Sequence, residues 1–163
     1  MRQQTYLRSR YQSLVGYTGQ LFIVIGILHL VPLAVIPFFP DEAPLADGFL
    51  LASIPLIILG AILRTRFAPK ESLSLTLQEG SVVVVGIWLT AILISTIPYM
   101  VSHDMTFVHA IFESTSGWTT TGLSVVDVTT APNLILFFRS FTQLAGGAGI
   151  AIIALGAGAG GGA

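Results

Sequence analysis

The sequence contains no cysteine and little charge. The absence of cysteine excludes disulfide frameworks, thiolate zinc sites, iron–sulfur clusters and cysteine nucleophiles. Charged residues make up 9% of the 163 residues and hydrophobic residues 53%, whereas an ordinary soluble domain is about 25% charged. The formal net charge of -1 gives no field strong enough to gather nucleic acid. The composition therefore argues against a water-soluble globule and against nucleic-acid binding.

Four charge-poor apolar segments are candidates to cross a bilayer, which takes about 20 residues. They are residues 21–39, 48–63, 81–101 and 134–155. Pro32, Pro37 and Pro40 predict a kink and then an end to the first segment. The second segment is short and contains Pro55, so it spans only if the arginines that follow it extend to the interface. We expect an all-α membrane protein with four transmembrane helices, embedded in a lipid bilayer.

Basic residues fall on one side of this arrangement. Arginine and lysine are retained in short cytoplasmic loops, and the connection between the first two segments is acidic instead, with Asp41, Glu42 and Asp47. Six of the seven basic residues lie before the first segment or after the second: Arg2, Arg8, Arg10, Arg64, Arg66 and Lys70. We therefore expect residues 1–20 to be a cytoplasmic N-terminus of a multi-pass protein of the inner cell membrane, and residues 101–133 to begin and end outside.

A half-length apolar helix is expected within that outer stretch. Residues 105–118 (MTFVHAIFESTSGW) cover only about half a membrane. Asp104 or Thr106 can cap the start of the helix, and Ser116 with Gly117 marks its end. The run TTTGL follows at once, before the fourth apolar segment. This order predicts a re-entrant pore helix and a selectivity-filter loop.

The residue types of this loop suit a cation. Removing water from a monovalent cation requires closely spaced carbonyl oxygens, glycine permits the backbone angles that aim them, and threonine hydroxyls add oxygen ligands or local hydrogen bonds. A Ser/Thr/Gly cluster between apolar runs is more often a plain turn. The pore loop is favoured by the whole order of span, half-helix, TTTG and span.

Two motifs resemble the Trk, Ktr and HKT superfamily of potassium transporters, and bacterial Trk membrane subunits in particular. FESTSGWTTTGLS at residues 112–124 looks like the first pore loop of these proteins, and FRSFTQLAGGAG at residues 138–149 looks like the start of the following helix. The resemblance implies potassium transport through four repeats of helix, pore loop and helix, preceded by two extra helices. Residues 21–80 would hold those two helices and their basic loop, residues 81–156 the first repeat, and residues 157–163 a glycine-rich, truncated tail.

The same resemblance implies which atoms bind the ion. The backbone carbonyls of Thr120, Thr121, Gly122 and Leu123 would face potassium, with Thr119 at the inner end. Gly122 stands where the family associates glycine with potassium preference and serine with sodium permeability. Potassium is then the transported substrate, and no cofactor is implied.

The chain also departs from the family pattern. Leu144 stands where a tryptophan is usual, and the sequence shows one filter segment where the family has four. Either the chain is the N-terminal third of a longer transporter, or it is a one-repeat protein that assembles as a homotetramer. The resemblance further implies a cytosolic nucleotide-binding regulatory subunit as a partner.

Two ionisable residues flank the expected filter. Glu113 lies in the pore helix at membrane depth, where an ionisable group is costly. It can attract cations or accept hydrogen bonds from backbone amides behind the filter, and we favour the second role. Arg139 falls about two turns into the last span; it is expected to pair with Glu113 or Asp127, with extension to the outer interface as the alternative. Glu113 and Arg139 are thus candidates for structural support of the filter.

Other chemistries are weaker alternatives. His29, His103 and His109 do not share the spacing of a metal site and are expected to be packed or interfacial. The glycines from position 146 onward favour close helix packing over a phosphate-binding loop. The main rival function is an intramembrane serine hydrolase built on Ser116 and His109, which lacks the usual glycine two residues before the serine. A non-conducting assembly subunit or fragment is the third alternative.

Overall fold

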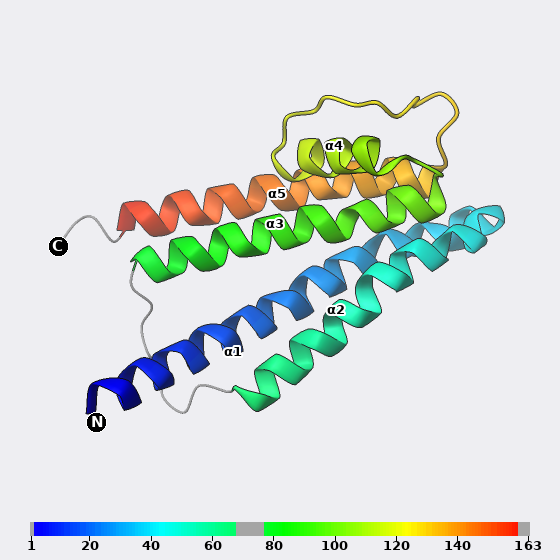
Figure 1. Cartoon of the computed structure of the whole chain (residues 1–163). Helices are drawn as coiled ribbons and strands as arrows, with labels where there is room; N and C mark the ends of the chain where they lie inside the picture. The colour runs from blue at the N-terminus through cyan, green and yellow to red at the C-terminus, as the bar shows by residue number, and fades with distance from the viewer. Residues whose placement is uncertain (1, 68–76, 160–163) are drawn as a thin grey trace.

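The computed structural model describes residues 2–67 and 77–159, and nearly all of them are helical. In chain order the elements are α1 (Arg2–Leu30), the 3-10 helices η1 (Val31–Phe38) and η2 (Pro40–Leu45), α2 (Ala46–Arg66), α3 (Leu77–Ser102), α4 (Phe107–Trp118) and α5 (Asn133–Ala159). Figure 1 shows α1 and α2 as an antiparallel pair, with α3 packed against that pair. The short α4 packs against both α3 and α5. The all-α class is confirmed, with no strand among the described residues.

Four helical segments of the described chain are long and apolar enough to cross a membrane. They are Tyr11–Phe38, Pro40–Arg66, Gln78–Ser102 and Asn133–Ala151. The first begins well before residue 21 because α1 is continuous from Arg2: residues 11–20 contain no proline, and Ser13, Gly16 and Gly19 on one side are buried. At the other end of the chain α5 continues to Ala159, three residues into the expected tail. Lys70 and residues 160–163 lie outside the described residues.

Prolines shape the first reversal of the chain. Pro32 lacks an amide hydrogen and its ring crowds the carbonyl of Leu28, and the α-helix tightens to a 3-10 helix at Val31. Phe39, which precedes Pro40, leaves the helical region with φ -133° and ψ 72°, as the residue before a proline tends to do. The predicted end of the segment is confirmed at Phe39, and where a kink was predicted the helix changes from α to 3-10.

Glycines allow α1 and α2 to pack at the closest range. A Cβ on Gly19 would lie 2.7 Å from the Gly60 carbonyl oxygen, and a Cβ on Gly60 would lie 2.6 Å from the Gly19 carbonyl oxygen. No side chain fits at these distances, so each glycine is in contact with the other helix's backbone. In this pair the C-terminal end of α2 lies near the N-terminal half of α1, at the opposite end from η1 and η2 (Figure 1).

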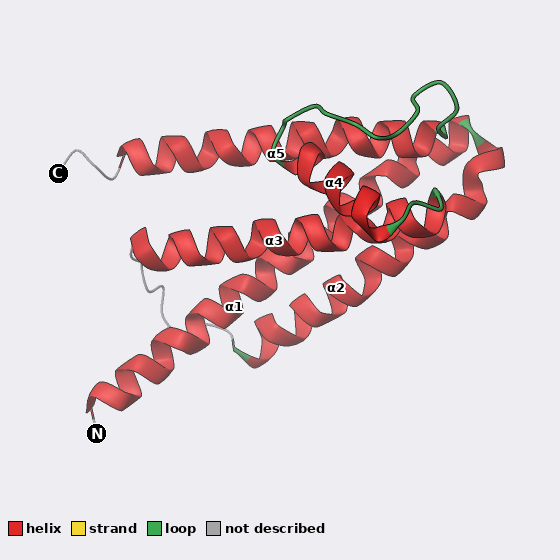
Figure 2. Cartoon of the chain, turned by 45° about the horizontal axis from the view of Figure 1, so that its top comes forward, coloured by secondary structure: helices red, strands yellow, loops and turns green. Residues whose placement is uncertain are grey.

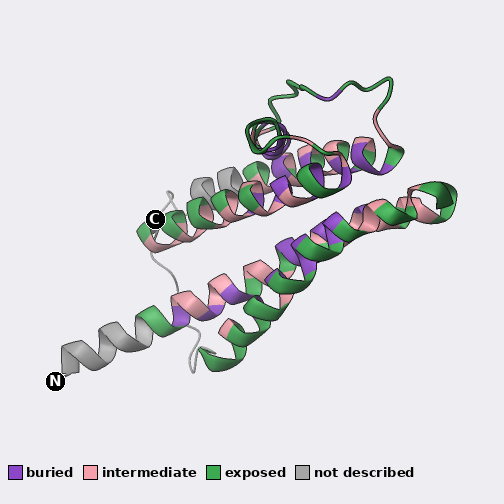
Figure 3. Cartoon of the chain, turned by 45° about the vertical axis from the view of Figure 1, so that its right-hand side comes forward, coloured by how far each residue is buried: buried purple, intermediate pink, exposed green. Residues whose placement is uncertain are grey.

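Two apolar clusters hold the helices together. One contains Phe49, Tyr99, Ala110, Leu134, Ile135 and Phe138, and the other contains Ile25, Leu56, Ala91 and Trp118. Figure 3 shows buried residues along the facing sides of the helices, with exposed residues on the outer sides. Those outer sides stay apolar: Ile58 of α2 is 54% exposed and Val82 of α3 is 74% exposed. Such faces suit lipid or further protein rather than water.

We predict that Gly19→Ala destabilises the helix pair. The added methyl meets the α2 backbone, with the Arg64 amide nitrogen at 2.8 Å, and overpacking of this kind costs roughly 1–3 kcal/mol. The matched control is Gly86→Ala in α3, whose Cβ would have nothing within 4 Å, so it should be neutral or stabilising by up to about 1 kcal/mol. Unfolding in detergent micelles, followed by circular dichroism, measures both. Equal stability of the two variants would contradict the close approach.

Candidate functional site

The short helix α4 buries one face. Its N-cap is Thr106, whose side-chain oxygen accepts a hydrogen bond from the His109 amide at 3.4 Å. Asp104, the other candidate cap, has a left-handed backbone with φ 49° instead. The buried residues include Ala110, Glu113, Ser114 and Gly117, which recur at the three- and four-residue spacing of one helical face. With 12 residues, α4 is about 18 Å long, roughly half the thickness of a bilayer's hydrocarbon core.

The chain leaves α4 through a Schellman motif. The amide of Thr120 donates to the Gly117 carbonyl at 3.0 Å, and the amide of Thr121 donates to the Ser116 carbonyl at 3.0 Å. Thr120 has φ 58°, at a position where glycine is usual and a β-branched residue is uncommon. A left-handed backbone costs a residue with a Cβ about 1–2 kcal/mol. Contacts elsewhere must offset this cost to hold the threonine–glycine segment, which is residues 119–123.

Side-chain hydroxyls fix both ends of the threonine–glycine segment. The Thr119 hydroxyl donates to the Thr115 carbonyl at 2.7 Å and lies 2.7 Å from the Thr121 hydroxyl oxygen. At the other end the Ser116 hydroxyl donates to the Leu123 carbonyl at 2.6 Å. Figure 2 shows in green the loop that continues from here, which runs from the end of α4 to the start of α5.

Glu113 lies behind this loop and is fully buried, with 0% exposure. Its Oε1 accepts hydrogen bonds from the amides of Val125 at 2.8 Å and Val126 at 3.2 Å, and from the Ser124 hydroxyl. Its Oε2 accepts from Arg139 Nε at 3.0 Å. The carboxylate is therefore bonded to backbone amides, which is the role that the sequence favoured over free attraction of ions.

Arg139 connects α5 to the same loop. Besides its ion pair with Glu113, its Nη2 donates to the Gly122 carbonyl at 3.3 Å and lies 3.5 Å from the Leu123 carbonyl oxygen. The guanidinium of Arg139, on α5, thus contacts both α4 and the loop that follows α4. The exposed fraction of the Arg139 side chain is 16%, so this cation does not extend freely to the interface.

Asp127, the other candidate partner of Arg139, is engaged locally. Its Oδ1 accepts hydrogen bonds from the Thr129 hydroxyl at 2.6 Å and the Thr129 amide at 2.9 Å. These two bonds, the hydroxyl first, lower the pKa of the exposed Asp127 carboxyl below its ordinary value. Of the two expected partners, the structure brings only Glu113 to Arg139.

The five carbonyls of the threonine–glycine segment divide into two groups. Those of Gly122 and Leu123 accept hydrogen bonds from Arg139 and Ser116. Those of Thr119, Thr120 and Thr121 accept none of the hydrogen bonds found in residues 2–67 and 77–159. Gly122 has φ 80°, a backbone conformation that glycine adopts without strain. The arrangement leaves three successive carbonyl oxygens available to a ligand.

Small residues allow α4 to pack closely against α5. Gly146 lies against the Trp118 carbonyl group, and a Cβ on Gly117 would lie 2.5 Å from Thr142 Oγ1. This confirms helix packing as the role of Gly146. The end of α4 is therefore held at a fixed distance from α5.

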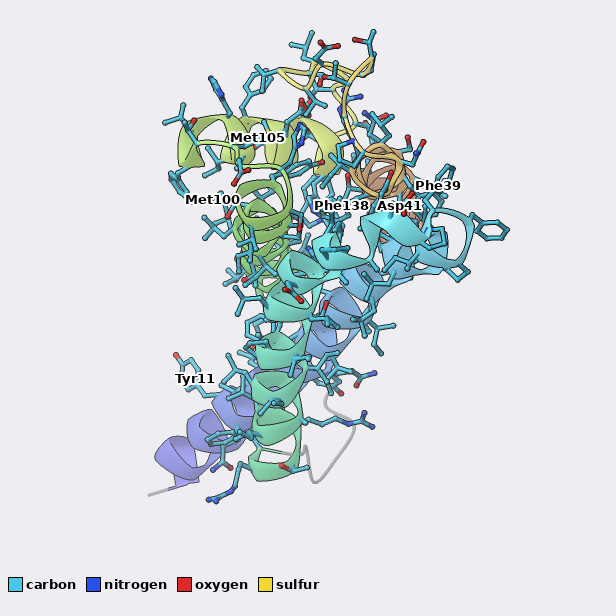
Figure 4. All side chains as sticks on the ribbon, turned by 90° about the vertical axis from the view of Figure 1, so that its right-hand side faces the viewer. Tyr11, Phe39, Asp41, Met100, Met105 and Phe138 are labelled. Carbon is cyan, nitrogen blue, oxygen red and sulfur yellow. The ribbon has the colours of Figure 1, made fainter. Side chains whose placement is uncertain are left out.

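A carboxylate missed by the sequence reasoning anchors the start of α5. Glu42 of η2 accepts hydrogen bonds through Oε1 from the Asn133 amide at 2.8 Å and Asn133 Nδ2 at 3.0 Å, and through Oε2 from the Leu134 amide at 2.7 Å. Figure 4 shows this bend, with Phe39 and Asp41 labelled, beside the first turns of α5. Only an indirect sequence signal pointed to this contact. The first turn of α5 contains no acidic residue of its own, although a negative charge there would interact favourably with the helix dipole.

The histidines and Ser116 give no support to other chemistry. Among the described residues no group of three or more His, Asp or Glu could hold a metal ion. His29 is buried and hydrogen-bonded, whereas His109 is exposed. Ser116 lies two helical turns from His109, about 10 Å along the axis, and its hydroxyl donates a hydrogen bond to the Leu123 carbonyl.

Comparisons with known proteins agree on one class. The TrkH family model, described as a cation transport protein, matches residues 47–156. An uncharacterized cation transporter of Methanocaldococcus jannaschii is 35% identical over 144 residues, which are 87% of this chain and 29% of that protein. The potassium uptake protein TrkG of Escherichia coli K12 is 31% identical over 131 residues, 78% of this chain and 27% of TrkG. The potassium uptake protein TrkH of the same strain is 37% identical over 89 residues, 53% of this chain and 18% of TrkH.

The chain spans less than a third of the length of these relatives. No solved structure matches it. The relatives are named as transporters, which are not enzymes. With four apolar helices, the matches class the chain among membrane transport proteins rather than hydrolases.

We predict that Glu113→Gln destabilises the fold because it leaves Arg139 unpaired and puts an amide group among hydrogen-bond donors. Removing one partner of a buried ion pair costs about 3–5 kcal/mol. The control Asp104→Asn removes an exposed carboxylate near the start of α4 and should have little effect on stability. Thermal unfolding in detergent measures both. In a double-mutant cycle with Arg139→Gln the two losses should be strongly non-additive, and simple additivity would show that the pair does not hold the loop.

Proposed function

This chain belongs to the TrkH family of cation transport proteins, and from that membership we propose that it takes part in potassium transport across the cell membrane. In this proposal residues 81–156 are one helix, pore loop and helix repeat, and residues 21–80 are the two helices that precede it. α4 is the re-entrant pore helix, and the threonine–glycine segment supplies one quarter of a selectivity filter.

The observation that carries the proposal is the set of three unengaged carbonyls at Thr119, Thr120 and Thr121. Backbone carbonyls replace the hydration shell of potassium in selectivity filters. They work only if the backbone holds its shape when water leaves, and here hydroxyl and amide hydrogen bonds hold the segment at both ends. Gly122 and Leu123 then form the outer part of the segment, where Arg139 and Ser116 fix the chain.

The direction of α4 also favours a cation. The C-terminal end of a helix carries a partial negative charge from its free carbonyls, and α4 ends at Trp118, directly before Thr119. α4 starts beside the end of α3, where the Met105 amide donates to the Tyr99 carbonyl at 3.2 Å. At its other end Trp118 lies in the same buried cluster as Ala91, a residue well inside α3. The path from the end of the bundle into its middle is that of a re-entrant helix.

Charge at the two ends of the bundle supports an orientation. Arg64 and Arg66 are in the last turn of α2, on the same side as the start of α1 (Figure 1). Asp41 and Glu42 lie in the first turn of η2 at the other end. By the positive-inside rule, the N-terminus is cytoplasmic and the start of α4 faces outward in the inner membrane.

One segment cannot surround an ion, so the proposal requires further filter segments. Three more come either from other repeats or from identical subunits. A cytosolic nucleotide-binding regulatory subunit is the further partner that the family resemblance implies. The transported ion is potassium, which is the substrate and not a resident cofactor.

We predict that Gly122→Ser admits more sodium. Position 122 has φ 80°, and a residue with a Cβ pays about 1–2 kcal/mol there, so the filter backbone should relax and the sodium-to-rubidium uptake ratio should rise roughly tenfold. The assay is uptake by cells that lack their own potassium transporters and express the full chain. Gly86→Ser is the matched control, since a Cβ there has nothing within 4 Å.

Two outcomes would count against the proposal. An unchanged ratio in Gly122→Ser, with rubidium uptake intact, would mean that the threonine–glycine segment does not select the ion. If a confirmed tetramer of the chain takes up no rubidium, the chain does not conduct by itself. That result is the one expected for a non-conducting assembly subunit.

A further inference from the structure

His29 of α1 lies at the centre of the bundle, although α1 precedes the proposed repeat. Its side chain is buried, and its ring centroid lies 6.4 Å from that of Trp118 and 5.6 Å from that of Phe138. Its Nδ1 is 2.8 Å from the Ile25 carbonyl oxygen, and its Nε2 is 2.8 Å from Ser95 Oγ. Both ring nitrogens are therefore hydrogen-bonded, one within α1 and one to α3.

The partners determine the direction of each hydrogen bond. A carbonyl only accepts, so Nδ1 of His29 carries the hydrogen and donates to Ile25. The neutral ring then accepts at Nε2, and the Ser95 hydroxyl donates to it. An indole nitrogen only donates, so Trp118 Nε1 donates to Ser95 Oγ, at 2.8 Å. Ser95 thus gives one hydrogen bond to His29 and receives one from Trp118.

Ser95 differs from two other buried serines, Ser53 and Ser114, in the acceptor of its hydroxyl. Ser53 donates to the Phe49 carbonyl at 2.6 Å and Ser114 donates to the Ala110 carbonyl at 2.7 Å, each four residues back in its own helix. This is the default for a serine inside a helix. His29 accepts the Ser95 hydroxyl hydrogen in place of a carbonyl four residues back, and this fixes the direction in which the oxygen accepts from the indole.

Trp118 is the residue through which this network can reach the ion pathway. It is the last residue of α4, directly before Thr119. Its carbonyl group lies against Gly146 of α5, while its ring packs in the cluster with Ile25 and Leu56. A rotation of the indole must therefore shift the backbone at the start of the threonine–glycine segment, because close packing leaves no room to absorb it.

We propose that His29 is a positioning residue that acts through Ser95 on Trp118 and so fixes where the threonine–glycine segment begins. α1 is then part of the support of the segment and not only a neighbouring helix. The coupling from His29 to Trp118 is a property of the fold. Its effect on ions rests on the proposed function.

The first experiment tests the coupling without ion transport. The full chain in lipid nanodiscs, labelled with ¹⁵N, contains two tryptophans, so its two indole N–H signals are assigned by Trp118→Phe. We expect His29→Leu and Ser95→Ala to shift the Trp118 indole signal and the Thr119 and Thr120 amide signals, while the Trp88 indole signal stays in place. His29→Gln, which keeps an acceptor near the Nε2 position, should restore most of the parent spectrum.

Ser53→Ala is the matched control for Ser95→Ala. It removes an equally buried hydroxyl, 0% exposed in both cases, whose hydrogen bond stays within α2. It should leave the Trp118 and Thr119 signals unchanged. If His29→Leu also leaves them unchanged while circular dichroism shows a folded chain, the coupling is overturned. If His29→Leu does not fold, Ser95→Ala decides between the same two results, because it is also expected to shift the Trp118 and Thr119 signals.

The second experiment measures ion selectivity in the same variants. Loss of one net hydrogen bond at Trp118 should lower the rubidium-to-sodium uptake ratio roughly fivefold in His29→Leu and Ser95→Ala, with His29→Gln and Ser53→Ala near the parent value. A shifted spectrum with an unchanged ratio would overturn the positioning role. A parent chain that takes up no rubidium but shows the expected spectral pattern would instead refute the proposed transport by this chain and leave the coupling standing.

Discussion

The buried carboxylate of Glu113 is the constraint around which the site is built. A charge at this depth is tolerated only if donors surround it, and four do: two amides and a hydroxyl from the loop and the guanidinium of Arg139. To deliver those donors the loop must fold back over α4, and α5 must lie beside it. The position of the threonine–glycine segment follows from this requirement. Glu42 then fixes the start of α5, less than two turns before Arg139, so the first turns of α5 are held both at their beginning and at the ion pair.

Much of the fold could be predicted from the sequence because membrane-spanning helices can be recognised by their length and apolar composition. The four spans, the short helix before the TTTG run, the effect of the prolines and the Thr106 cap all depend on residues close together in the chain. The family could be identified from two local motifs for the same reason. The sequence predicts the first apolar segment from residue 21, whereas the helix that contains it begins at Arg2. The first turns of this helix are polar, and a search for apolar runs does not detect a helix there.

The contacts that shape the site could not be predicted in the same way. Glu42 and Asn133 are 91 residues apart, and His29 and Ser95 are 66 apart. Helical periodicity relates only residues that are a few positions apart, so it cannot predict contacts at such separations. The pairing of Glu113 with Arg139 could be expected because both are costly in an apolar layer and few partners exist. The division of the five carbonyls into engaged and free groups depends on side-chain directions, which a sequence pattern does not contain.

The guanidinium of Arg139 gives the threonine–glycine segment two unequal ends. It touches the Gly122 carbonyl at 3.3 Å and contacts none of the three threonine carbonyls among the described hydrogen bonds. Its charge is only partly neutralised along the segment because Glu113 lies behind the loop. The Coulomb repulsion between Arg139 and a cation is therefore stronger at the Gly122 carbonyl, which the guanidinium contacts, than at the threonine carbonyls, which it does not contact. In the four-fold filter proposed above, this difference would favour a cation at the threonine carbonyls over one at the Gly122 carbonyl.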